Sequence, residues 1–174
     1  MKYYTFDRAD SGAIGKAFEM AIKDALHRKN ADRVSPCGSS DFIFNHHHYE
    51  VKQNGGVMRY ADTSADFKGS KRIIYATHIA YEIVELTPDK MTVTVDLANT
   101  DLLVVERSAF VEFLKSINCV KVNESRGTVN IQTVYNYSKN AYHGRKGYAI
   151  ENWAMENEWD EDDIIGAILE GVGL

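Results

Sequence analysis

The chain contains little proline or cysteine and no long apolar run. Its 174 residues include two prolines and two cysteines, and Cys37 and Cys119 are far apart and belong to no Cys-x-x-Cys pattern. This usage gives little support to a disulfide framework or a thiolate zinc site. No segment approaches the roughly 20 apolar residues that a bilayer span requires, and residues 1–12 lack the apolar core of a signal peptide. We therefore expect a cytoplasmic protein that does not enter a membrane.

Positive charge is also scarce and unevenly placed. The net charge is −5, which argues against broad non-specific binding of polyanions because such binding needs clustered Lys and Arg. A local basic surface is still compatible with this balance, and the candidate DNA contacts are Lys71, Arg72, Arg145 and Lys146. Residues 156–163 hold six carboxylates. We expect this acidic run to favour the N-terminus of a following helix; a partner-binding tail is the alternative.

The composition is that of one ordinary globular domain, with 44% hydrophobic and 26% charged residues. We expect residues 1–174 to form one domain and residues 141–174 to be a helical C-terminal extension of it. Apolar residues at three- and four-residue spacing predict an amphipathic helix over residues 12–26.

Alternating or apolar runs predict a series of strands and one further helix. The strands are expected at residues 41–44, 49–53, 72–79, 90–97 and 101–105, with a late hairpin at 119–122 and 128–135. A helix is expected at residues 108–117. This order predicts a mixed α/β or α+β fold, with a sheet flanked by helices.

The first two of these strands sort their side chains in an informative way. If they form a hairpin with a two-residue turn at Asn45 and His46, Asp41 lies opposite Glu50, whereas a four-residue turn places it opposite Lys52. Either turn puts these three charged side chains on one face and leaves the other face apolar. A three-residue turn would bury a charge among aromatic rings, so we expect an even one.

Two carboxylates facing each other on a sheet repel, so something should compensate for their charge. A hard divalent cation does this, because Mg²⁺ takes oxygen ligands and is commonly held by one or two carboxylates with water and substrate phosphate. Lys52, about 6.5 Å along the strand from Glu50, would then hold or polarise an attacking water. Asp41, Glu50 and Lys52 therefore suit phosphodiester hydrolysis.

An Asp, eight intervening residues and Glu-x-Lys, preceded by a helix that carries Glu19, resemble the PD-(D/E)xK nuclease superfamily with its restriction-endonuclease-like fold. The chain is most similar to its Holliday junction resolvase-like branch. The resemblance covers the first third to half of the chain, and Ser40 stands where the motif has proline. It implies that Asp41 and Glu50 bind the metal, that Lys52 activates water and that Glu19 completes the site.

The resemblance also implies the reaction and its partners. Relatives use Mg²⁺ or Mn²⁺ to cut DNA, leave 5′-phosphate and 3′-hydroxyl ends, and act as homodimers on branched substrates. The short chain shows no separate recognition domain, which favours structure-selective over sequence-specific cutting.

Simpler interpretations compete with this one. Glu19 and Lys23 have the spacing of a surface ion pair, and Glu50 and Lys52 have that of a solvent-facing strand edge. His46–His48 invite a zinc site, but consecutive residues at a turn point in different directions, so we expect them to be exposed to solvent. The functional alternative is a non-catalytic acidic binding protein that recruits a protein partner through its C-terminal tail.

Overall fold

The helices and strands in the computed structural model follow most of these expectations. The structure describes residues 2–36, 40–53, 57–59, 72–76, 78–117, 121–123, 128–130 and 152–173. Its helices are α1 (Ala13–Asn30), α2 (Arg107–Ser116) and α4 (Ile164–Gly171), with 3₁₀ turns at Ala31–Arg33 and Leu97–Asn99 and helical residues at 152–156. No helix within these residues is both long and apolar enough to cross a membrane.

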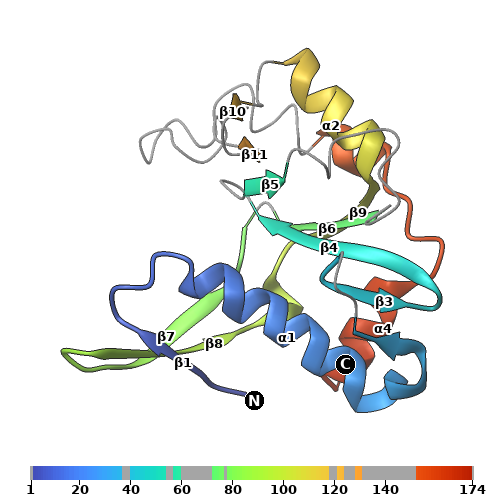
Figure 1. The fold of residues 1–174 in the computed structure, drawn as a ribbon. Helices are drawn as coiled ribbons and strands as arrows, with labels where there is room; N and C mark the ends of the chain where they lie inside the picture. The colour runs from blue at the N-terminus through green and yellow to red at the C-terminus, as the bar shows by residue number, and fades with distance from the viewer. Residues whose placement is uncertain are drawn as a thin grey trace.

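Three sheets contain the strands, and the mixed α+β fold is confirmed (Figure 1). The largest sheet has the order β2-β3-β4-β6-β9, formed by Val34–Ser35, Phe42–Phe44, His47–Gln53, Arg72–Ala76 and Leu102–Glu106. Strands β4 and β6 run parallel, and its other neighbours are antiparallel. A second sheet has the order β1-β8-β7, formed by Tyr4–Asp7, Lys90–Val95 and Tyr81–Leu86. The third has the order β10-β11-β5, formed by Lys121–Asn123, Thr128–Asn130 and Val57–Arg59.

The expected hairpin has the expected register. Phe42 pairs with Tyr49 and Phe44 with His47, so Asn45 and His46 form a two-residue turn. Both turn residues have positive φ, at 51° and 68°, as the tight turns that match strand twist require. The predicted even turn is therefore confirmed.

The five-stranded sheet lies between two apolar layers. One face of the β3-β4 hairpin packs Phe42, Phe44, Tyr49 and Val51 into a core with α1 and α4, and the rings of Phe42 and Tyr49 stack at 5.6 Å. On the other face of the sheet, β6 and β9 pack against α2 and the helical residues 152–156; this second core consists of Ile73, Tyr75, Val105, Phe110 and Ala154. Charged side chains on this hairpin must therefore lie at an edge or find partners.

Helix α4 brings the C-terminal segment into the first core. Ile164, Ala167 and Ile168 are buried with α1 residues. Gly171 approaches α1 so closely that a Cβ at this position would lie 1.8 Å from the Ala25 carbonyl oxygen. Only glycine fits this contact, which places residues 160–163 beside the turn of the β3-β4 hairpin (Figure 1).

Candidate active site

Glu19 lies at the border of the buried stripe of α1. Ala17, Phe18, Ala21 and Ile22 are buried around it, so the helix must hold Glu19 near the sheet. Its Oε2 is 3.0 Å from the Lys23 ammonium, the expected i,i+4 ion pair. The same carboxyl is also hydrogen-bonded to Asp41. The surface ion pair is therefore confirmed, and the role of Glu19 as an accessory ligand stays a prediction.

Asp41 lies just before β3, at the edge of β4. Strand β3 begins at Phe42, so the Val51 amide of β4 has no strand partner on this side. Asp41 Oδ2 accepts a hydrogen bond from that amide at 2.7 Å, and the Asp41 amide donates to the Tyr49 carbonyl at 3.0 Å. The Val51 amide, which would otherwise lack a hydrogen-bond partner, therefore has one. The Asp41 carboxylate is held between α1 and β4.

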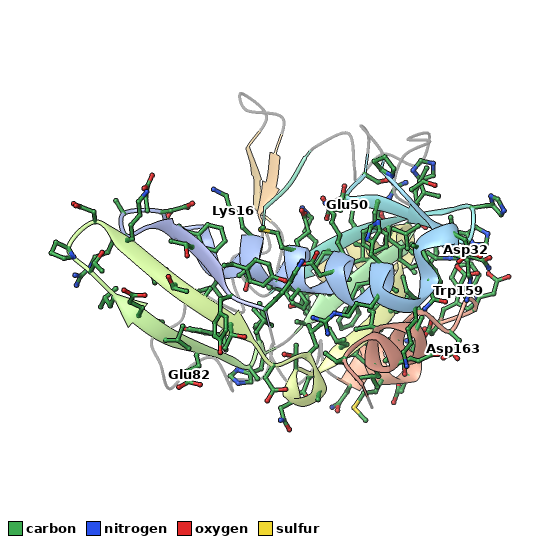
Figure 2. The ribbon with its side chains drawn as sticks, turned by 90° about the horizontal axis from the view of Figure 1, so that it is seen from below. Lys16, Asp32, Glu50, Glu82, Trp159 and Asp163 are labelled. Atoms are coloured by element: carbon green, nitrogen blue, oxygen red, sulfur yellow. The ribbon has the colours of Figure 1, made fainter. Side chains whose placement is uncertain are left out.

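Glu50 and Lys52 project from the face of β4 opposite the α1 core. Their neighbours on the parallel strand β6 are Ile73 and Tyr75, which are fully buried. The Lys52 ammonium lies 3.3 Å from Glu50 Oε2, and the two side chains are 17% and 10% exposed. The interpretation of this pair as a solvent-facing strand edge is therefore wrong. Figure 2 shows Glu50 on β4, apart from Trp159 and Asp163 in the C-terminal segment.

Negative charge is in excess where these residues meet. Burial, the hydrogen bond to Glu19 and the charge of Glu50 together raise the pKa of Asp41 to about 8, although the Val51 amide opposes the change. When all three carboxylates are ionised, they share two lysines, Lys23 and Lys52, which leaves one negative charge unbalanced. We name the group formed by Glu19, Asp41, Glu50 and Lys52 the carboxylate cluster.

The donor set of the carboxylate cluster suits a hard cation, since carboxylate oxygens are what Mg²⁺ and Mn²⁺ prefer. The ligands are not yet in place, because no group of three or more His, Cys, Asp or Glu side chains in the described parts of the chain is arranged to hold a metal ion. Glu19 and Asp41 are bound to each other instead. A cation would have to replace their hydrogen bond.

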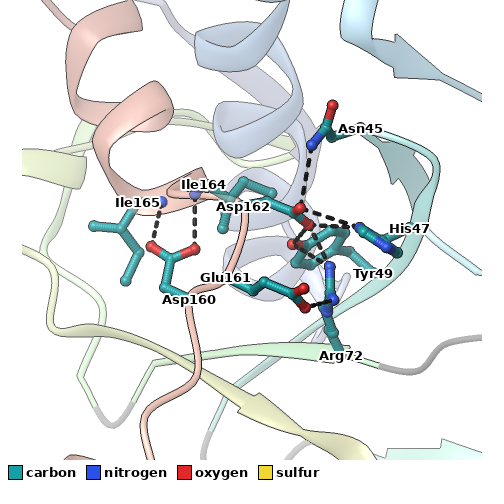
Figure 3. Close-up of polar contacts among 9 residues, drawn as sticks. All are labelled: Asn45, His47, Tyr49, Arg72, Asp160, Glu161, Asp162, Ile164 and Ile165. Atoms are coloured by element: carbon teal, nitrogen blue, oxygen red, sulfur yellow. Dashed lines mark hydrogen bonds and ion pairs between the residues drawn. The ribbon is translucent and has the colours of Figure 1, made fainter.

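A second carboxylate, Asp162, lies at the turn end of the same hairpin (Figure 3). It accepts hydrogen bonds from Asn45 Nδ2 at 3.2 Å, His47 Nδ1 at 2.9 Å and Tyr49 Oη at 2.5 Å, and it pairs with Arg72. Burial raises its pKa, but the hydrogen bonds and the Arg72 charge outweigh burial and hold the pKa below its ordinary value. We name these five residues the Asp162 cluster.

Arg72 does not fit the predicted role of a DNA contact. Its side chain is 4% exposed, pairs with Asp162 and Glu161, and lies 4.7 Å from the ring centroid of Trp159. A guanidinium enclosed in this way has no free surface for a phosphate, so the prediction for Arg72 is wrong. Lys71, Arg145 and Lys146 lie outside the described residues.

The expected solvent exposure of the histidine run holds only for His46. His47 contacts Asp162, and His48 Nδ1 lies 3.0 Å from the Ser40 hydroxyl, so both rings are partly buried. The acidic run is also built into the fold. Asp160 accepts hydrogen bonds from the Ile164 and Ile165 amides at 2.7 and 3.1 Å, as expected for a carboxylate before a helix.

Comparison of the chain with protein-family models, with curated proteins and with solved structures found no match. The Asp162 cluster was missed by sequence reasoning. One signal was present, because an arginine that begins the apolar strand Arg72–Ala76 requires a carboxylate partner once it is buried.

Proposed function

We propose that the chain is a divalent-metal-dependent deoxyribonuclease with a restriction-endonuclease-like fold. Asp41 and Glu50 serve as metal ligands, Glu19 as an accessory ligand and Lys52 as the residue that positions the attacking water. Mg²⁺ or Mn²⁺ is the expected cofactor. The fold assignment is supported by a mixed sheet whose β3-β4 hairpin carries the motif and whose α1 carries Glu19.

The observation that carries this proposal is that Asp41 interacts with two further carboxylates beside the strand that carries Lys52. Glu19 comes from α1, Asp41 from the start of β3 and Glu50 from β4, yet Asp41 interacts with both of the others. Such an arrangement destabilises the fold, since like charges are brought together with partial loss of water. Groups whose pKa is displaced in this way concentrate at functional sites.

The residues have distinct tasks in the proposed hydrolysis. A bound divalent cation supplies charge stabilisation to the phosphoryl oxygens and lowers the pKa of a bound water. Lys52, held beside Glu50 at 3.3 Å, directs its ammonium toward an attacking water or the developing negative charge. Asp41 is held in place by the Val51 amide, so little reorganisation of its backbone is needed when it binds the cation.

DNA is the proposed substrate, and branched DNA the preferred form. This choice rests on the resemblance to resolvases. A homodimer with two active sites would cut both strands of a junction symmetrically.

The test is cleavage of supercoiled plasmid and a synthetic four-way junction in Mg²⁺ or Mn²⁺, with EDTA as the metal-free control. Lys52→Ala and Asp41→Asn should each lower the cleavage rate by at least about 100-fold, the usual scale for losing one charged group that acts in the transition state. Lys90→Ala is the matched control. Lys90 lies on β8, in a different sheet from β4, and also pairs with a carboxylate, that of Asp7.

Metal-dependent cutting that survives Lys90→Ala and is lost in the other two variants would support the nuclease. Equal rates for wild type and Lys52→Ala would assign any cutting to a contaminant and refute the proposal. Junction cleavage in excess of plasmid cleavage would support the branched substrate. Sedimentation equilibrium tests the dimer independently.

The alternative is a non-catalytic acidic binding protein that recruits a partner through its C-terminal tail. Glu156, Glu158, Glu161 and Asp163 of the acidic run are exposed. Asp160, Glu161 and Asp162 are half of the six carboxylates in the run, and each makes an internal contact.

A further inference from the structure

Gln53 is the last residue of β4 and lies against α1 at a glycine. A Cβ built on Gly15 would lie 2.7 Å from Gln53 Nε2 and 3.6 Å from Cδ, so the Gln53 amide fills the space that a side chain would take. Gly15 does not have a left-handed φ, so its backbone conformation does not require glycine. Glycine inside a helix is unfavourable relative to alanine. The close approach of Gln53 is the structural reason for it.

This contact places the Gln53 amide beside the carboxylate cluster. Glu19 follows Gly15 by four residues, so the two share one face of α1. Gln53 also shares a face of β4 with Val51, whose amide binds Asp41, and lies about 6.5 Å further along the strand. Gln53 therefore lies on the α1 side of β4, where Glu19 lies, whereas Glu50 and Lys52 project from the opposite face of the sheet.

The amide is also available to a ligand. Gln53 is partly exposed, and its side chain makes no hydrogen bond to the part of the chain that the structure describes. The other polar side chains of the carboxylate cluster are engaged with one another or with the backbone. A neutral donor suits a phosphate here, because it neither competes with a cation for the carboxylates nor adds to their negative charge.

We propose that Gln53 Nε2 donates a hydrogen bond to a non-bridging oxygen of the DNA phosphate that occupies the carboxylate cluster. Gln53 then holds the phosphate on the α1 side of β4, and Gly15 sets the position of the amide. This inference rests on the proposed nuclease function and deepens it by naming a substrate-binding residue.

The test uses variants that separate the donor from its packing. Gln53→Met keeps the length of the side chain and removes the donor, and Gln53→Glu keeps the shape and adds a negative charge. Gly15→Ala displaces the amide without changing Gln53. Gly12→Ala is its matched control on the same helix, because a Cβ there would meet Asp10 Oδ1 at an ordinary 3.4 Å.

Junction cleavage in Mg²⁺ gives kcat and KM. Fluorescence anisotropy in the Lys52→Ala background gives DNA affinity without cutting. Gln53→Met should raise KM and weaken DNA binding about tenfold, the scale of one lost hydrogen bond, and Gln53→Glu should weaken it further. Gly15→Ala should act in the same direction, and combining it with Gln53→Met should add nothing, since both changes remove one contact. Gly12→Ala should leave both values unchanged.

Two results would overturn the inference while leaving the nuclease intact. The first is wild-type cutting with the same KM in Gln53→Met, and the second is equal effects of Gln53→Met and Gln53→Glu. Failure of the wild type to cut any substrate would instead refute the proposed function. Thermal unfolding of each variant shows that the comparison is made between folded proteins.

Discussion

The two ends of the β3-β4 hairpin each hold a carboxylate in a confined setting, with opposite outcomes. At the turn end, Asp162 has a guanidinium, a phenol, an imidazole and an amide around it, and its pKa is lowered. At the open end, Asp41 has two further carboxylates as neighbours, and its pKa is raised to about 8.

This difference separates a structural carboxylate from a candidate catalytic one. The Asp162 cluster is complete, because four donor groups surround the carboxylate. The carboxylate cluster is incomplete, because its charge is balanced only when a cation or proton is added. A fold that retains such a local cost is expected to use it.

The largest predicted effect comes from a substitution in the Asp162 cluster. Asp162→Ala should lower the free energy of unfolding by about 3 kcal/mol, because Arg72 stays buried with the half-exposed Glu161 as its remaining carboxylate partner among the described residues. Urea denaturation measures this loss. Asp7→Ala, which removes the exposed partner of Lys90, is the control and should cost less than about 1 kcal/mol. A loss of similar size in both variants would contradict the assigned role of Asp162.

The next effect is the pH dependence of the free energy of unfolding that Asp41 of the carboxylate cluster causes. Between its ordinary pKa of 3.8 and about 8, Asp41 holds a proton in the folded state that it has lost in the unfolded state. Stability should therefore fall as pH rises through this window, with a slope approaching about 1.4 kcal/mol per pH unit. Asp41→Asn removes the titration while keeping an acceptor for the Val51 amide.

Urea denaturation of both proteins at several pH values in EDTA tests this prediction. Between about pH 5 and pH 7, the wild type should lose on the order of 2 kcal/mol relative to Asp41→Asn. If the free energy of unfolding changed with pH in the same way in both proteins, the pKa of Asp41 would not be raised in the folded state.

A smaller effect follows from adding the missing cation. Mg²⁺ at about ten times its dissociation constant should raise the free energy of unfolding of the wild type by about 1.4 kcal/mol at neutral pH. Asp41→Asn should lose this gain, and EDTA should reverse it in the wild type. Potassium chloride at matched ionic strength controls for screening. An equal gain in both proteins would place the cation elsewhere.

The hairpin was predictable from sequence because its signals are local. Alternation from Asp41 to Lys52 fixed which side chains share a face, and any odd turn would have buried a charge. Strand β7 was missed for a local reason as well. Its register shifts between Ile83 and Glu85, which breaks the alternation, and all six of its side chains are exposed.

The role of Arg72 was unpredictable because its partner is distant in the chain. Beside Lys71 it has the pattern of a basic surface, and only the packing of α4 on α1 brings Asp162 to it across 90 residues. The carboxylate cluster shows the same limit. The sequence predicted its members, but the hydrogen bond between Glu19 and Asp41 depends on how α1 lies along the sheet.

The smallest predicted effect is that of removing Lys23, which pairs with Glu19 of the carboxylate cluster. Lys23→Ala should cost only about 0.3–0.5 kcal/mol, as for other exposed i,i+4 ion pairs. It should also strengthen Mg²⁺ binding about twofold, because the Glu19 carboxylate loses a competing cation. Lys16→Ala is the matched control, since Lys16 is also on α1 and pairs with Asp10, which precedes the helix and is outside the carboxylate cluster. Titration calorimetry should show tighter Mg²⁺ binding for Lys23→Ala alone; equal affinities in the two variants would remove Glu19 from the ligand set and leave Asp41 and Glu50.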